Sequence, residues 1–310
     1  MNSSRRVFLS RATLVAGTVV FAKHIDPISP AGKPGTFSAG AANSLTVYHT
    51  NSINGNAGPV YKTAGGLRKI NTHLKNGGNA GLLLDAGNFL TRHGSVDEQK
   101  QVVAMMNITG YKAAGISGLD LSDGGSLLSA LNPLMQFSLI NCNHRFTAEV
   151  NSFIKPYEVF KNGGIKIGIT AVCAPVKGAA YKNAIECANR TARFLKEDER
   201  CHLVICLSDL GPAGQNPELN DQALAEASEH IDLIIGNDHG KLHNNDRVMR
   251  NKLKHEVIFS AAAARGLTIG KTVVNFSEDM TKKGIAVEHI IPGKPADQKF
   301  GAAMRELSLA

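Results

Sequence analysis

The chain has 310 residues, of which 43% are hydrophobic and 19% are charged, and this balance is ordinary for a globular protein with a sizeable core. Its 34 Lys and Arg residues against 26 Asp and Glu residues give a formal net charge of +8, without any block of basic residues. The chain has no Trp and only 5% aromatic residues. Because nucleic-acid binding relies on basic blocks and on rings that stack with bases, we predict no nucleic-acid partner.

The first 22 residues resemble a twin-arginine signal peptide. Arg5 and Arg6 precede an apolar run, residues 12–22, which is too short to span a bilayer as a helix. The family pattern often has Lys where this chain has Ser10. The resemblance implies a bacterial protein exported to the periplasm or cell envelope, with cleavage after Ala22. A cytosolic protein with a chance pair of arginines is the other interpretation.

Two further expectations concern the rest of the chain's organisation. Residues 23–44 contain several Pro and Gly residues and are predicted to be a flexible linker. After the linker, no apolar stretch reaches about 18 residues, so we predict no transmembrane helix.

From residue 45 onward, strands and helices are predicted to alternate, because short apolar runs are separated by segments with apolar residues every three or four positions. The predicted strands cover residues 45–49, 80–84, 112–116, 137–142, 157–160, 165–172, 202–207 and 231–235. The predicted helices cover residues 67–74, 96–108, 127–134, 184–195 and 221–230. Three more strands follow, at residues 257–262, 268–276 and 285–291. This order predicts a layered α/β architecture with mixed sheets.

The five cysteines give no clear disulfide framework. They are Cys142, Cys173, Cys187, Cys201 and Cys206, and an odd number leaves at least one thiol free. Cys201 and Cys206 are five positions apart on one predicted strand, so they face opposite sides and cannot pair with each other. The simplest interpretation is that the thiols are buried and act as small hydrophobic side chains.

Five polar segments each follow a predicted strand. They are residues 49–55, 85–88, 117–120, 208–211 and 236–239. In order and spacing they resemble the motifs H-T-N-D-x-H-G, D-A-G-D, G-N-H-E-F-D, H-x-G and G-H-S-H of the secreted 5′-nucleotidase family, within the calcineurin-like phosphoesterases. Weaker counterparts of family motifs are Gly65-Gly66, Cys142-Asn143 and residues 264–266.

This resemblance covers residues 45–292 and implies a metallophosphatase-like domain over residues 45–310. It implies a four-layer α/β/β/α sandwich with two mixed sheets, and a site at the carboxyl ends of the strands, where loops of both sheets meet. Family members that hydrolyse nucleotides carry a second, carboxy-terminal domain that binds the base. We expect that domain to be absent here and to be a candidate for a separately encoded partner.

The residues at the family's metal-site positions are mostly neutral in this chain. Two divalent cations about 3.5–4 Å apart repel each other, so several carboxylates and imidazoles must hold them. By the resemblance, the metal-site positions are occupied by Ser52, Asn54, Asn88, Gly118, Asp209, Asn237 and His239, of which only His239 is unchanged. Leu119 replaces the catalytic histidine and cannot donate a proton.

We therefore predict a secreted pseudoenzyme that acts as a binding or assembly subunit and carries no metal or other cofactor. Asn88 keeps nearly the shape of Asp, and a neutral amide avoids the repulsion among crowded carboxylates. A protein partner, such as the missing carboxy-terminal domain or an envelope complex, would fit this role.

The alternative is a metal-dependent phosphoester hydrolase with a rearranged site that holds one Mn, Fe or Zn ion. Asp209 and His239 would be its main ligands, and Asp120, Asp238 and His243 could join them. Each of the last three also has a structural interpretation, as a cap of the following turn for Asp120 and as part of a solvated loop for the other two. Asp85 is expected to hydrogen-bond the backbone of its own turn.

Overall fold

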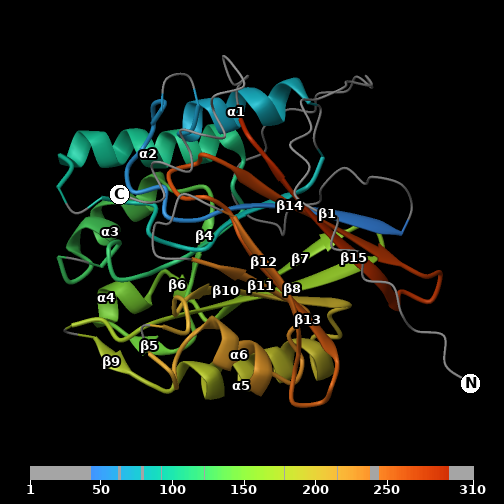
Figure 1. The fold of residues 1–310 in the computed structure, drawn as a ribbon. Coiled ribbons are helices and arrows are strands. Elements are labelled where there is room, and N and C mark those ends of the chain that lie inside the picture. The colour runs from blue at the N-terminus through green and yellow to red at the C-terminus, as the bar shows by residue number, and fades with distance from the viewer. Residues whose placement is uncertain are drawn as a thin grey trace, which may run out of the picture.

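A computed structural model describes residues 43–61, 64–77, 80–91, 93–121, 123–177, 179–214, 216–237 and 244–292. The predicted signal peptide and nearly all of the predicted linker lie outside the described residues. The described residues form four layers, in which helices cover the outer faces of two stacked β-sheets (Figure 1). The predicted α/β/β/α sandwich is therefore confirmed. None of the described helices is long and apolar enough to cross a bilayer.

The first sheet has seven strands in the order β15-β14-β1-β2-β3-β4-β6. Their bounds are β1 (Ser44–Thr50), β2 (Leu82–Asp85), β3 (Ala113–Gly115), β4 (Ser138–Ile140), β6 (Ile154–Lys155), β14 (Ile269–Phe276) and β15 (Lys282–Ile290). Strands β1 to β6 of this sheet are parallel, and β14 runs antiparallel to both β1 and β15. The helices on its outer side are α1 (Leu67–Asn76), α2 (Val96–Thr109), α3 (Ser126–Leu131) and α4 (Ala148–Asn151).

The second sheet has six strands in the order β12-β13-β11-β10-β8-β7. Their bounds are β7 (Tyr157–Asn162), β8 (Ile165–Cys173), β10 (Leu203–Asp209), β11 (Leu233–Gly236), β12 (Asn245–Arg250) and β13 (Glu256–Ala261). The four central strands are parallel, and the edge strands β7 and β12 are antiparallel. Helices α5 (Ala184–Glu197) and α6 (Asp221–Ala227) cover its outer face, and β5 (His144–Arg145) pairs with β9 (Ala180–Tyr181) in a separate ribbon.

The core has three apolar clusters, one between the sheets and one under each helical layer. Side chains such as Leu84, Ile167 and Ile205 fill the space between the sheets and are fully buried. Strand β10 is buried along its whole length, because helices and the other sheet cover both faces, and it therefore reads as an almost continuous apolar run. Burial of these faces is the main term that stabilises the sandwich.

Helix α2 shows how the sequence sets its own element boundaries. Ser95 accepts a hydrogen bond from the backbone of Glu98, and the Glu98 side chain accepts one from the Ser95 backbone. This capping box satisfies amide groups that have no partner inside the helix. At the other end, Gly110 adopts a left-handed conformation that closes the helix. Both ends agree within one residue with the prediction from the sequence.

Several predicted elements differ from the structure. The helix predicted through residue 134 ends at Leu131 and continues as a 3-10 turn, Asn132–Leu134, because Pro133 has no backbone N–H to donate. The helix predicted to residue 230 ends at Ala227. Edge strand β12 was not predicted, because its polar and charged residues hide the apolar alternation that marks a strand. All five cysteines are free thiols, as expected for Cys201 and Cys206.

Candidate functional site

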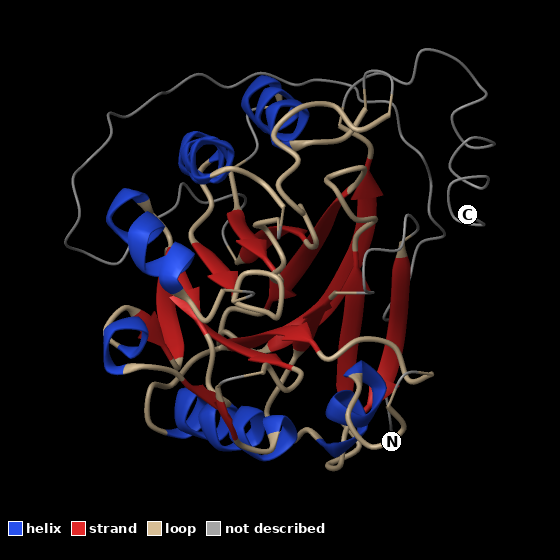
Figure 2. Cartoon of the chain, turned by 90° about the vertical axis from the view of Figure 1, so that its left-hand side faces the viewer, coloured by secondary structure: helices blue, strands red, loops and turns tan. Residues whose placement is uncertain are grey.

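Five loops converge at the edge where the parallel strands end, and Figure 2 faces this edge. They follow β1 and β2 of the first sheet, β3 beside them, and β10 and β11 of the second sheet. Backbone hydrogen bonds tie them in pairs. Asn54 N–H donates to Asn88 O (2.9 Å), and Asn237 N–H donates to Ser208 O (2.9 Å). The loops that carry the described site positions are therefore brought together.

The backbone of these loops is unusual at three of the site positions. Ser52, Asn54 and Asn88 have φ angles of 44°, 50° and 58°, in the left-handed region that most side chains avoid. Asn tolerates this conformation better than most residues, because its short polar side chain can bond locally. Gly87 has a φ of 111°, and a Cβ there would lie 3.0 Å from Ser117 Oγ. The tight turn after β2 therefore brings Asn88 close to the β3 loop.

Asn88 is hydrogen-bonded through both ends of its side-chain amide. Its Oδ1 accepts from Ser117 Oγ (2.6 Å) and from the Leu119 backbone N–H (3.1 Å). Its Nδ2 donates to Asp209 Oδ1 (3.2 Å). Because Asn88 lies in the loop after β2 of the first sheet and Asp209 ends β10 of the second, the amide links the two sheets.

Two more polar contacts cross between the sheets. Ser52 Oγ donates to Asn237 Oδ1 (2.5 Å), and Asn51 Nδ2 donates to Gly236 O (2.9 Å). Some atoms of these side chains stay unsatisfied, since Asn51 Oδ1, Asn54 Oδ1 and Asn237 Nδ2 are buried without a hydrogen-bond partner. Together with Asn88, these contacts form a network of mostly neutral groups across the edge.

Asp209 is only 8% exposed. Burial raises its pKa to about 8, and the nearby charge of Asp120 adds to the shift. Hydrogen bonds from the Gly118 backbone and from the side chains of Ser117 and Asn88 oppose the shift. At neutral pH this group therefore carries a proton in most molecules.

Asp85 and Asp120 are buried in the same region, and both accept hydrogen bonds from backbone N–H groups. Asp85 accepts from the Gly87 N–H (2.8 Å) and from Thr50 Oγ1 (2.6 Å), and burial raises its pKa to about 8. The predicted bond within its own turn is confirmed.

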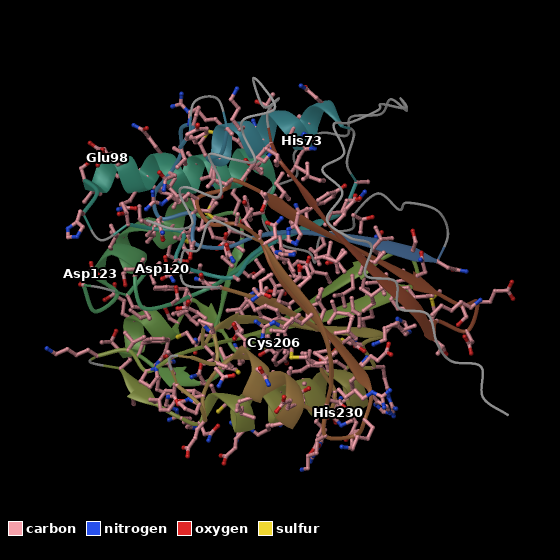
Figure 3. The ribbon with its side chains drawn as sticks, viewed as in Figure 1. His73, Glu98, Asp120, Asp123, Cys206 and His230 are labelled. Carbon is pink, nitrogen blue, oxygen red and sulfur yellow. The ribbon has the colours of Figure 1, made fainter. Side chains whose placement is uncertain are left out.

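The predicted role of Asp120 as a cap of the following turn is wrong. Its carboxylate accepts from the backbone N–H groups of Asn88 (2.8 Å) and Leu90 (2.9 Å), and from Ser117 N–H (3.1 Å). Asp120 therefore anchors the β2 loop rather than the residues after it, and Figure 3 places it at the same edge of the molecule. Burial raises its pKa to about 6.

The remaining predicted positions differ in what can be said of them. Gly118 and Leu119 are half-buried in the loop after β3, and a Cβ added at Gly118 would meet no atom within 4 Å. Asp238, His239 and His243 lie outside the described residues. The imidazole ligands of the one-metal alternative are therefore not placed, and among the described residues no three His, Cys, Asp or Glu side chains gather as a metal site.

Sequence reasoning missed a polar chain beside this site. Ser260 Oγ donates to Asp246 Oδ1 (2.6 Å), so His49 Nε2, 3.1 Å from Ser260 Oγ, must supply the proton of their bond. His289 Nε2 lies 2.8 Å from Asp246 Oδ2. The four residues come from four strands of both sheets. Burial lowers the pKa of His49 to about 3, with His289 adding to the shift and Asp246 opposing it. His49 is therefore neutral within this hydrogen-bonded chain.

Comparison with known proteins finds relatives among phosphoesterases. No protein-family model matches the chain. It is 24% identical over 281 residues to the trifunctional nucleotide phosphoesterase protein YfkN of Bacillus subtilis, covering 76% of this chain and 18% of YfkN. The 5′-nucleotidase precursor of Thermus thermophilus has the same fold, with a TM-score of 0.71, 19% identity, and coverage of 86% of this chain and 58% of that one.

A third comparison is with the calcineurin-like phosphoesterase structure of YfkN from Bacillus subtilis. Its TM-score is 0.62 and its identity 16%, with 86% of this chain and 97% of that chain covered. The relatives and structural neighbours are thus 5′-nucleotidases and calcineurin-like phosphoesterases, as the motif resemblance predicts. This chain spans 18% of the curated relative and 58% of the Thermus nucleotidase.

Proposed function

We propose that this chain is a non-catalytic binding or assembly subunit built on the phosphoesterase fold and exported to the bacterial cell envelope. The observation that carries the proposal is the side-chain amide of Asn88, whose donor and acceptor atoms are both used inside the protein. The export part of the proposal rests on the sequence of the first 22 residues.

The donors at the described positions do not fit the pair of divalent cations that the fold implies. The Asn88 side chain donates an N–H group to Asp209, and its oxygen accepts hydrogen bonds from Ser117 Oγ and the Leu119 backbone. A cation between Asn88 and Asp209 would have to displace this N–H group and, at neutral pH, a proton from Asp209. Ser52 and Asn237 likewise bond to each other. These hydrogen bonds support the proposal that the loops are held together without ions.

Proton transfer also lacks a donor at the expected position. Departure of an alcohol from phosphate is assisted by a group that protonates the leaving oxygen. Leu119 offers only an apolar side chain and its backbone N–H, and that N–H already donates to Asn88 Oδ1. The proposal therefore predicts both weak metal binding and no turnover.

The deciding experiment measures metal content and phosphatase activity of the purified mature chain. We expect substoichiometric Mn, Fe and Zn by mass spectrometry, and no hydrolysis of p-nitrophenyl phosphate above the blank, with or without added Mn²⁺. The matched positive control restores the family residues together: Ser52→Asp, Asn54→His, Asn88→Asp, Gly118→Asn, Leu119→His, Asp209→His and Asn237→His. This variant is expected to bind metal at the same edge.

One result would overturn the proposal in favour of the one-metal hydrolase. It is a stoichiometric ion together with turnover that a chelator abolishes and that both Asp209→Ala and His239→Ala remove. Turnover that survives both substitutions would point instead to a contaminating enzyme.

A further inference from the structure

The small ribbon of β5 and β9 stands at the same edge as the candidate site but shares no residue with it. His144 pairs with Tyr181 across the ribbon. Asp209 is the register partner of Cys173, whose Sγ lies 3.5 Å from His144 Nδ1. Cys173 therefore connects His144 of the ribbon with Asp209 of the neighbouring strand. Figure 1 shows the ribbon at the lower left, beyond the ends of the central strands.

The ribbon carries a fixed group of aromatic rings. The His144 ring stacks on Phe146 at a centroid distance of 5.8 Å and meets Tyr181 edge-on at 5.3 Å. His144 Nε2 accepts a hydrogen bond from the Val176 N–H (3.3 Å), which orients the ring. Burial lowers the pKa of His144 to about 4, so it stays uncharged near neutral pH. The ring of Tyr181 is thus supported from beneath, while the residue is 37% exposed.

The charged residues of segments 142–147 and 174–183, which carry the ribbon, are all basic, and the nearest acidic residues along the chain are Glu149 and Glu186. Arg145, Lys177 and Lys182 are exposed, and none of them forms an ion pair with another described residue. Residues 142–147 and 174–183 contain no Asp or Glu. Other exposed cations include ones paired with a carboxylate, such as Lys252 with Glu229, and ones without an ion pair among the described residues, such as Lys75. The ribbon is therefore a positive patch with an exposed tyrosine and no acidic residue of its own.

We infer that this ribbon is a docking surface for an acidic segment of a protein partner, an inference that rests on the proposed role as a binding subunit. Tyr and Arg are the residues that most often dominate protein interfaces, and a support that needs no rearrangement lowers the cost of binding. Unpaired cations around the ring would meet carboxylates of the partner and steer its approach.

Two other occupants fit the ribbon less well. A small ligand needs a concave site, and a hollow of about 20 Å³ lies away from the ribbon, between α6 and β12, where Arg247, Met249 and Phe259 line it. An anionic membrane surface is recognised by clusters of roughly four to eight Lys and Arg residues. The ribbon offers only Arg145, Lys177 and Lys182.

The test measures binding of the full mature chain to a synthetic 20-residue poly-glutamate peptide by fluorescence anisotropy at low and physiological salt. The charge reversal Arg145→Glu with Lys182→Glu is expected to weaken binding about tenfold or more. Tyr181→Ala leaves the charge unchanged and is expected to weaken binding about threefold to tenfold. The matched control, Arg68→Glu with Lys75→Glu on α1, makes the same change in net charge on exposed residues outside the ribbon.

Three results would overturn the inference. They are unchanged binding after the ribbon reversal, equal loss in the α1 control, and no loss for Tyr181→Ala. Binding of AMP or of phosphatidylglycerol vesicles that the ribbon reversal removes, without peptide binding, would also overturn it and assign the patch to a small ligand or to lipid. Circular dichroism and melting temperature check that each variant is folded. Because turnover is measured separately, an active chain that still binds the peptide would refute the proposed function but not the surface.

Discussion

Asp209 is buried and Asp232 is half-buried, both at ends of strands in the second sheet, yet their surroundings are opposite. Asp232 precedes β11 and meets two cations, Lys196 Nζ at 2.8 Å and Lys282 Nζ at 2.6 Å. Burial alone would raise the pKa of Asp232, but the two lysines lower it below its ordinary value. Asp209 ends β10 and meets the neutral amide of Asn88 and the charge of Asp120, so its pKa rises to about 8.

The two edges of the sandwich thus join the sheets in different ways. Lys282 begins β15 of the first sheet, so its contact with Asp232 is an ionic link between the sheets at the amino ends of the parallel strands. At the carboxyl ends, amides, hydroxyls and a protonated carboxyl group link the two sheets through hydrogen bonds. The comparison shows that neutral hydrogen-bonding groups can connect two sheets where an ionic link does so at the other edge.

The largest effect is expected at the ionic edge. Asp232→Asn leaves two partly buried lysines facing a neutral group. Removing one partner of a fully buried ion pair costs about 3–5 kcal/mol, and a loss of about 3 kcal/mol is expected here because the lysines keep some contact with solvent. Urea unfolding followed by circular dichroism measures the loss, and the exposed ion pair Lys100–Asp97 supplies a control, since Asp97→Asn is expected to change little. Equal effects of the two substitutions would contradict the distinction between buried and exposed pairs.

Asp209→Asn is expected to stabilise the folded protein relative to the wild type, by an amount that depends on pH. The folded-state pKa of about 8 lies above the unfolded value of 3.8, so Asp209 contributes stability below pH 3.8 that is lost as the pH rises towards 8. Asn carries no such proton, and its stability relative to the wild type should grow by about 2–4 kcal/mol between pH 5 and pH 8. Unfolding curves at both pH values measure this difference, and a constant difference would refute the raised pKa.

A smaller effect is expected for Asn88→Asp. The new carboxylate would face Asp209 and Asp120, and like charges in a buried site repel, so the variant should lose about 2 kcal/mol at pH 8. The loss should shrink at pH 5, and Mn²⁺ should recover part of it. Asn88→Ala is the matched control, because it removes the same hydrogen bonds without adding charge. Recovery by Mn²⁺ in that control would contradict the assignment.

The smallest effect is expected for Ser52→Ala, which removes the hydroxyl that donates to Asn237 Oδ1. A buried hydrogen bond of this kind contributes about 1 kcal/mol. A double-mutant cycle with Asn237→Ala isolates the contact from other effects of the two substitutions. A coupling energy of zero would show that the contact does not connect the sheets.

Much of the fold was predictable because local signals agree with it. The apolar run of β10 and the caps of α2 at Ser95 and Gly110 mark their elements from the sequence alone. Strand β12 was not predictable, because an edge strand needs no alternation of apolar residues when only part of it is covered. The ribbon pairs Arg145 with Ala180, 35 positions apart, and His144 with Tyr181, 37 positions apart, and no local sequence pattern predicts such a pairing.

The sequence by itself determined which residue types stand at the five strand ends, and therefore that they are mostly neutral. Only the tertiary structure decided what those residues do, because hydrogen-bond partners such as Asn88 and Asp209 are 121 positions apart and lie at the strand ends of different sheets. It also decided the charge of Asp209, which depends on burial and on Asp120. The sequence specifies the residue type at each position, whereas burial and hydrogen-bond partners are set only when the two sheets stack.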